Sequence, residues 1–370
     1  MCRWFTYLGL EDQLLEDVLL RPSHSIVKQI DSHFLPAEHA SFDPSKHQPS
    51  TISPPSVILS SKVKARPIHP ASANDTGSPN PLTNMDGFGL GWWTGAYEEF
   101  DSGAQGNQAS RPVVYKSTRP PLNDLVLKSL ARGVKTRSVV AHVRAGTGLT
   151  PVVETNCHPF TYGRHLFCHN GVLGSFHLFR PLLLSNLPLR YQMSLLGTTD
   201  SEYCAALYFY HLCGEGGDWE KLYPVAEMGA AMRKTVQVLE KMKSAAEAKA
   251  GRGSAKEKEA DHSSLNFLVS SGASLVAIRF SSPKEHEPPS LYYSSTAGAT
   301  LNRKFRGHPD EGKPGVLWDE GEIEQGEHGK HVIVGSEPNT FNAKEWKLIA
   351  PGEMILVDEE MEITAEALDI

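Results

Sequence analysis

Cysteine, positive charge and long apolar runs are all scarce in this sequence. Its 370 residues include five cysteines, and so odd and sparse a set does not suit a disulfide framework. The formal net charge of −7 argues against a nucleic-acid-binding surface. No run approaches the roughly 18 apolar residues that cross a membrane, and the N-terminal region, with "LEDQLLEDVLL", lacks a signal-peptide pattern. We therefore expect a cytoplasmic protein that binds neither nucleic acid nor membranes.

A glycine-rich nucleotide loop is also missing. The stretch "DGFGLGWW" at 86–93 fails the G-x-G-x-x-G spacing, and tryptophans follow it where a phosphate site needs a helix N-terminus. We predict a strand there, whose glycines let another segment of backbone approach closely. No cofactor is expected.

The composition that remains, 40% hydrophobic and 21% charged, is typical of a globular protein with a sizeable core. Segments 36–81, 245–262 and 302–330 are rich in proline, serine, glycine or charge and are predicted to be loop insertions. Between them lie short β-type runs such as "SVVAHVRA", and "LNFLVSSGASLVAIRF" predicts a hairpin. Helices are predicted from the capping-box pattern Thr199-x-x-Glu202 and after Pro224. Many strands and few long helices indicate a layered α+β fold.

The first chemical signal is the opening "MCRWFTYLG". Removal of Met1 would leave Cys2 with both a thiol and a free α-amine, and the amine could take the proton of the thiol. An N-terminal cysteine of this kind carries its own general base. The alternative is an ordinary small residue in front of a buried strand.

The densest cluster of reactive side chains is "NCHPFTYGRHLFCHNG" at 156–171. A strand that ends at Asn170 and Gly171 could aim a side-chain amide and a backbone N–H at one oxygen, as an oxyanion hole requires. The alternative is a zinc site. Its ligands would come from Cys157, His158, His165, Cys168 and His169. Pro159, Tyr162 and Gly163 disfavour the helix that would bring these ligands together, so we expect no metal.

Two further motifs carry charges suited to an amino acid. In "AHVRAGTG", Arg144 leaves an apolar strand for a small-residue loop, where its planar fork could bind a carboxylate; the alternative is an arginine capping a sheet edge. In "GTTDSEYCAAL", Asp200 could bind an ammonium group, or simply cap the helix. Together with the nucleophile and oxyanion hole, these residues describe a site for an α-amino acid attacked at its side-chain carbonyl.

Ordered motifs then resemble those of a known family. "MCR", "DGFG", "AHVRAGTG", "NCHPF", "HNG", "TDSE" and "GSEP" follow the order found in class II (N-terminal nucleophile) glutamine amidotransferases. The resemblance spans nearly the whole chain and implies one domain, residues 2–370, with a four-layer αββα sandwich of two antiparallel sheets. "MCR" and "ETNCHPF" are similar to the fungal subunits of a cytosolic glutathione-degradation complex, which cleave a γ-glutamyl bond.

The resemblance also implies the main catalytic groups. Cys2 would be the nucleophile and its amine the base, which requires that Met1 be removed. Asn170 and Gly171 would form the oxyanion hole.

The remaining matched positions would bind substrate. Arg144, with help from Thr147, would hold the α-carboxylate, and Asp200 the α-ammonium. His158 lies in a matching motif, but its role stays open. Relatives of the glucosamine-phosphate type have a bulky aromatic after the clamp arginine, whereas this chain has Ala145, so the neighbouring pocket is expected to be wider.

These features favour hydrolysis of the γ-Glu–Cys bond of glutathione, with release of glutamate and Cys-Gly. The resemblance implies a metallopeptidase-like partner subunit. A second interpretation is a glutaminase that supplies ammonia to a separate synthase, because the chain ends at Ile370 with no room for a synthase domain of its own. A third is a binding protein without activity, in which Met1 is retained and blocks the amine.

Overall fold

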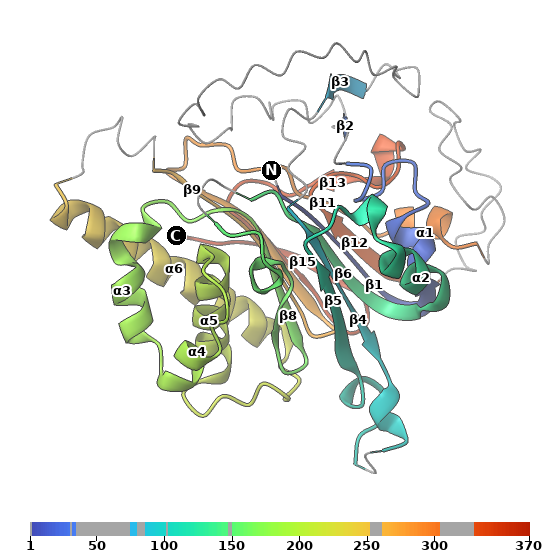
Figure 1. The fold of residues 1–370 in the computed structure, drawn as a ribbon, viewed down its shortest axis with the longest axis horizontal. Coiled ribbons are helices and arrows are strands. Elements are labelled where there is room, and N and C mark those ends of the chain that lie inside the picture. The colour runs from blue at the N-terminus through green and yellow to red at the C-terminus, as the bar shows by residue number, and fades with distance from the viewer. Residues whose placement is uncertain are drawn as a thin grey trace.

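Two antiparallel sheets packed face to face form the centre of the molecule (Figure 1). The computed structural model describes residues 2–29, 32–34, 75–79, 86–100, 103–146, 150–251, 261–303 and 329–370. Within these ranges the first sheet has seven strands. In order across the sheet they are β13 (Lys347–Leu348), β11 (Tyr292–Ser294), β12 (His331–Gly335), β1 (Arg3–Leu14), β6 (Lys135–Val143), β4 (Phe88–Thr94) and β5 (Arg111–Ser117).

The second sheet has six strands in the described ranges. Their order is β15 (Ile363–Ala367), β14 (Glu353–Val357), β10 (Leu275–Ser282), β9 (Ser263–Ser270), β8 (His165–Val172) and β7 (Phe160–Tyr162). A short separate pair, β2 (Ser32–Phe34) and β3 (Asp75–Pro79), lies outside both sheets.

Helices cover the outer face of each sheet, which gives four layers. The first sheet is covered by α1 (Leu15–Leu19) and α2 (Leu125–Gly133). The second is covered by α3 (Phe176–Asn186), α4 (Leu189–Met193), α5 (Asp200–Cys213) and α6 (Val225–Lys249). The predicted αββα sandwich is therefore confirmed.

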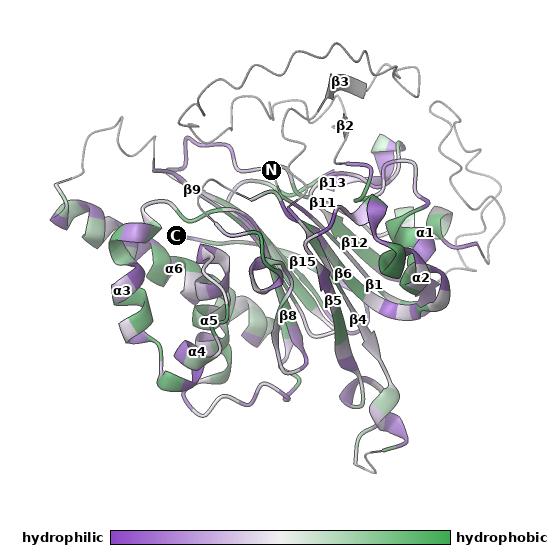
Figure 2. Ribbon diagram, in the orientation of Figure 1, coloured by the Kyte–Doolittle hydropathy of each residue, from purple (hydrophilic) through white to green (hydrophobic). Residues whose placement is uncertain are grey.

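Side chains alternate between the faces of the strands, because successive residues of a strand point to opposite sides. On β1, Trp4 and Leu8 enter the apolar layer between the sheets, whereas Phe5 and Tyr7 face α1 and α2. Figure 2 shows the result as hydrophobic strands in the centre and mixed helices outside. Because both faces of each sheet are covered, the sequences of the strands are almost continuously apolar.

Most local predictions agree with the structure. The predicted hairpin is β9 and β10, and the helices after Thr199 and Pro224 are α5 and α6. The capping box is only half formed: the Thr199 hydroxyl accepts the Glu202 backbone N–H at 3.3 Å, but the Glu202 carboxylate binds the N–H groups of Leu196 and Gly197 instead of returning to Thr199.

The predicted insertions fall mostly outside the described residues. Helix α6 continues to Lys249, so the first part of the segment 245–262 is helical and not a loop as predicted. Within the described ranges, no helix is both long and apolar enough to cross a membrane.

Candidate active site

Cys2 lies at the start of β1, where the neighbouring strand β6 ends. The pairing of Arg3 with Val143 brings Cys2 beside the loop that follows β6. The Ala145 backbone N–H donates to the Cys2 sulfur at 3.3 Å, and the thiol is 3.4 Å from the Ala145 carbonyl oxygen. A backbone N–H directed at sulfur stabilises negative charge there, as a thiolate nucleophile requires.

Arg144 lies next to this contact and is almost fully buried, at 3% exposed. Its backbone is fixed to the start of β4, because the Arg144 N–H donates to Gly87 O at 2.8 Å and Asp86 N–H donates to Arg144 O at 3.1 Å. The Nη1 atom of its guanidinium has no hydrogen-bond partner among the described residues. A buried guanidinium with an unused donor is suited to a carboxylate that arrives with a ligand. Thr147, predicted to assist it, lies outside the described residues.

Strand β4 confirms the predicted use of its glycines. A Cβ on Gly89 would lie 1.8 Å from the carbonyl oxygen of His158, and one on Gly91 would lie 2.3 Å from the side chain of Leu166. Because Gly89 has no side chain, the segment 157–159 can lie directly on the first sheet. This contact places His158 between the sheets, beside the ring of His142.

His158 is buried, and neither ring nitrogen has a hydrogen-bond partner among the described residues. Its ring centroid is 4.1 Å from that of His142 and 4.6 Å from that of Phe160. Burial lowers the pKa of His158 well below its ordinary value and that of His142 to about 3. Both imidazoles are therefore neutral at physiological pH, and His158 has unused polar atoms that a ligand can meet.

The structure contradicts the helical grouping that a zinc site would need. His165 and His169 lie on strand β8 and face the helix layer, whereas Cys168 faces the other sheet. Across the described ranges, no group of three histidine, cysteine or acidic side chains is arranged to hold a metal ion.

Asn170 comes from the second sheet and reaches the strand that carries Cys2. Its Nδ2 donates to the Ser336 hydroxyl at 3.2 Å, and the same hydroxyl accepts the Trp4 backbone N–H at 3.1 Å. Its Oδ1 is buried without a partner in the described part of the chain. The next residue, Gly171, has φ of +150°, and a Cβ there would lie 1.9 Å from Ser264 O.

Asp200 is the first residue of α5, and Thr199 is the helix cap. One carboxylate oxygen of Asp200 accepts the Leu173 N–H at 2.8 Å, directly after β8, and the other accepts the Ser201 N–H at 2.8 Å. The carboxylate therefore ties the helix to the strand that carries Asn170. The Ser201 hydroxyl also donates to that second oxygen at 3.3 Å, whereas the oxygen bound by Leu173 keeps a lone pair for a ligand, so the capping and ligand-binding roles are compatible.

A cavity of about 570 Å³ opens where the edge strands β5 and β7 of the two sheets meet. It is lined by Val114, Tyr115, Lys116, Glu154, Thr155, Phe160, Thr161, Tyr162, Ser194, Leu196 and Glu202. Burial lowers the pKa of Lys116 and raises that of Glu202. None of the predicted site residues lines this cavity, which adjoins the site through helix α5 and does not form it.

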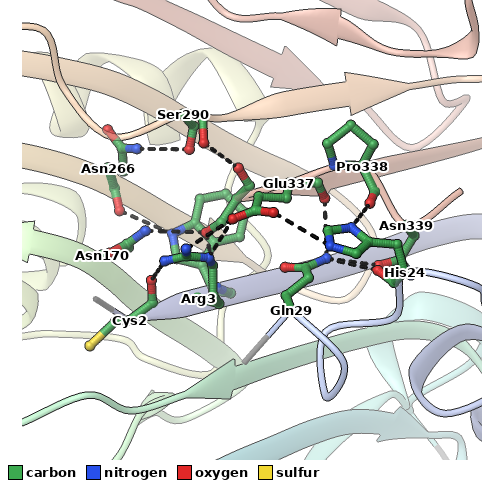
Figure 3. Close-up of polar contacts among 12 residues, drawn as sticks. Cys2, Arg3, His24, Gln29, Asn170, Asn266, Ser290, Glu337, Pro338 and Asn339 are labelled. Carbon is green, nitrogen blue, oxygen red and sulfur yellow. Dashed lines mark hydrogen bonds and ion pairs between the residues drawn. The ribbon is translucent and has the colours of Figure 1, made fainter. Parts of the chain in front are cut away.

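The sequence analysis gave no role to Ser336, Glu337 or Arg3. Arg3 binds both Glu337 and the carbonyl oxygen of Cys2 (Figure 3), and the Ser336 hydroxyl accepts the Trp4 N–H. The signal available was a glutamate in the apolar run "HVIVGSEP", where an unpaired charge is unfavourable. Its partner could not be read from the sequence, since Arg3 and Glu337 are 334 positions apart.

Comparisons with known proteins show the family of the chain. The model of class-II glutamine amidotransferases matches residues 74–286, more than half of the chain, so the chain belongs to that family. Family membership makes it an enzyme of the amidohydrolase kind.

Individual relatives extend the match. The probable glutamine amidotransferase DUG3 of Saccharomyces cerevisiae is 27% identical over 97% of this chain and 82% of its own length. The gamma-glutamyl-hercynylcysteine sulfoxide hydrolase of Mycobacterium tuberculosis is 30% identical over 92 residues, 25% of this chain and 34% of its own. A glutamine aminotransferase class-II domain protein from Silicibacter pomeroyi has a TM-score of 0.51, with 18% identity and full coverage of both chains, and shares the fold.

Proposed function

We propose that this chain, as a single catalytic domain of residues 2–370, hydrolyses the γ-Glu–Cys bond of glutathione and releases glutamate and Cys-Gly. The observation that carries the proposal is the position of Cys2: its sulfur contacts the loop of Arg144, and the strand that follows it is tied to Asn170 through Ser336. These contacts support a site in which Cys2 is the nucleophile, Arg144 binds substrate and Asn170 is an oxyanion donor.

In this mechanism the Cys2 α-amine takes the thiol proton, and the thiolate attacks the γ-glutamyl carbonyl carbon. The Asn170 amide and the Gly171 N–H stabilise the oxyanion of the tetrahedral intermediate. The amine of Cys-Gly leaves with a proton from the α-amine of Cys2, and a thioester to glutamate remains. Water, activated by the same amine, hydrolyses the thioester and restores the thiol.

Substrate binding uses opposite charges at the α-carbon. Arg144 binds the α-carboxylate and Asp200 the α-ammonium, and Thr147 assists the arginine. The Ala145 N–H contacts the sulfur, and a small side chain at this position suits a leaving group larger than ammonia. The Mycobacterium tuberculosis relative is by name a hydrolase of a γ-glutamyl derivative of a cysteine compound, which supports a cysteine-type leaving group.

We further propose that the enzyme works with a metallopeptidase-like subunit in the cytoplasm. The test compares glutamate release from glutathione and from glutamine, using protein whose intact mass confirms loss of Met1, with and without extract of the native host. The Cys2→Ala variant should abolish release, whereas Cys213→Ala, at the far end of α5 from Asp200, should retain it.

The outcomes separate the candidate functions. Release mainly from glutathione, increased by extract, supports the proposal. Release mainly from glutamine supports a glutaminase that supplies ammonia to a synthase. Activity that survives in Cys2→Ala refutes both mechanisms.

A further inference from the structure

A buried ion pair lies directly behind the proposed nucleophile. The Nε and Nη2 atoms of Arg3 are each 2.9 Å from Oε1 of Glu337, and both side chains are almost fully buried, at 6% and 2% exposed. The third nitrogen, Nη1, donates to the backbone carbonyl oxygen of Cys2 at 3.0 Å. Figure 3 shows the Cys2 carbonyl directed at Arg3 while the sulfur points away from the pair.

The second oxygen of Glu337 faces His24. His24 Nε2 is 3.5 Å from Glu337 Oε2, and His24 Nδ1 is 2.7 Å from the carbonyl oxygen of Pro338. A carbonyl oxygen can only accept a hydrogen bond, so Nδ1 carries a proton and donates it. The Gln29 amide donates to the His24 carbonyl at 3.0 Å, which fixes the segment that carries the imidazole.

The residue before Glu337 reaches the other half of the site. The Ser336 hydroxyl accepts from the Trp4 N–H and from the Asn170 amide, and Ser336 N–H donates to Trp4 O at 3.0 Å. The short segment after β12 therefore contacts the nucleophile strand on one side and the oxyanion amide on the other.

Stability alone is a weak explanation for this ion pair. Removing two charges from water costs several kcal/mol per ion, and a well-packed apolar pair of similar volume is often as stable or more stable. What an apolar pair could not do is hold the Cys2 carbonyl. That contact fixes the peptide plane after Cys2, and with it the position of the Cα atom that carries both the thiol side chain and the α-amine.

We propose that Glu337 is a positioning residue for the reaction, which holds the Arg3 guanidinium on the carbonyl of Cys2 and so orients the nucleophile toward the oxyanion hole. The inference rests on the proposed function of Cys2. Glu337 acts through Arg3 and touches no substrate. We expect substrate binding by Arg144 and Asp200 to depend little on the pair, because Arg144 is held by the backbone of Asp86 and Gly87, and Asp200 by the N–H groups of Leu173 and Ser201.

The experiment measures kcat, KM and the melting temperature of Glu337→Gln on glutathione, with holoenzyme reconstituted with host extract where extract is required. The amide keeps the shape of the side chain but weakens its hold on the guanidinium. We expect kcat to fall at least about 10-fold, since a misplacement of 1 Å can cost about 100-fold, with KM within about threefold. The control is Glu247→Gln, a buried glutamate on α6 that accepts from the Ser175 hydroxyl at 2.8 Å, and it should keep both constants.

Two further variants keep the test decisive. Glu337→Asp preserves the buried charge but shortens its reach, so it should fold and still lose kcat. Combining Glu337→Gln with Arg3→Lys should cost no more than the worse single variant, because both act on one contact. A normal kcat in folded Glu337→Gln and Glu337→Asp, or additive losses in the double variant, would overturn the inference. Failure of Cys2→Ala to abolish activity would instead refute the proposed function.

Discussion

Gly171→Ala tests the geometry of the proposed oxyanion hole most directly. The new Cβ would lie 1.9 Å from the carbonyl oxygen of Ser264, whereas side chains essentially never come closer than 3.0 Å, so strand β9 must retreat by about 1 Å. Ser264 cannot move alone: its carbonyl oxygen lies 3.0 Å from His169 Nε2, and its hydroxyl accepts the Val172 N–H at 3.3 Å. The strain must therefore displace Gly171 as well.

The expected magnitude follows from that displacement. Overpacking of this kind costs about 1–3 kcal/mol of stability, and a displacement of about 1 Å in a catalytic group lowers turnover about 100-fold. The assay is glutamate release per folded molecule, with the folded fraction taken from a urea titration. Gly214→Ala is the matched control, since Gly214 also has positive φ, +69°, but no atom lies within 4 Å of its Cβ position. A kcat within threefold of the parent in folded Gly171→Ala would refute the reasoning.

Three further predictions concern Asn170, Arg144 and the buried histidines. Asn170→Ala should lower kcat by about 10²–10³-fold, the cost of one oxyanion donor. The control Asn266→Ala, opposite it on β9, should lower stability but keep activity per folded molecule. A near-normal kcat in Asn170→Ala contradicts the assignment. Arg144→Lys should raise KM for glutamine about 10- to 100-fold, since a hydrogen bond to a charged group is worth about 1.5–3 kcal/mol. It should also narrow the preference for glutamine over 4-aminobutanamide, which lacks the α-carboxylate; an unchanged preference counts against the clamp. Burial lowers the pKa of His165 from its ordinary value of 6.5 to about 4. Below pH 6.5 the unfolded state therefore binds more protons than the folded state, and the free energy of unfolding should fall between pH 6.5 and 4 by up to about 1.4 kcal/mol per pH unit. In His165→Gln the side-chain amide can still donate to the carbonyl oxygen of Lys221, so the urea midpoint should depend less on pH. A midpoint that changes with pH as in the parent contradicts this prediction.

The sequence predicts those parts of the fold that local patterns specify. Apolar runs bounded by turns predict β1, β6, β8, β9, β10 and β12, because strands covered on both faces are continuously hydrophobic. The sequence analysis predicts no helix at α3, where Pro181 lies inside the helix and disfavours it in a reading of local pattern.

In the site, too, local motifs predict some residues, whereas contacts between distant segments are not predicted. Cys2, Arg144, Asn170 and Asp200 lie in short recognisable motifs, and the structure brings the segments that carry them to one region. The contact of Arg3 with Glu337 joins the two ends of the chain and depends on the pairing of β1 with β12. A local sequence pattern cannot predict the pairing of two strands so far apart in the chain.

Strand direction explains why the site lies at one edge of the sandwich. In the first sheet β1 runs antiparallel to both β6 and β12, so the start of β1 meets the end of each neighbour. Cys2 therefore lies between the loop after β6, which carries Arg144, and the segment after β12, which carries Glu337.

The second sheet contributes the end of β8, and contacts between the sheets set its distance from β1. Trp4 bridges that gap, because its backbone N–H binds Ser336 and its indole N–H donates to Asn266 O on β9 at 3.2 Å. β9 pairs with β8 at Asn170. The separation of nucleophile and oxyanion donor thus depends on the layer of side chains between the sheets, and core packing there is part of the catalytic geometry.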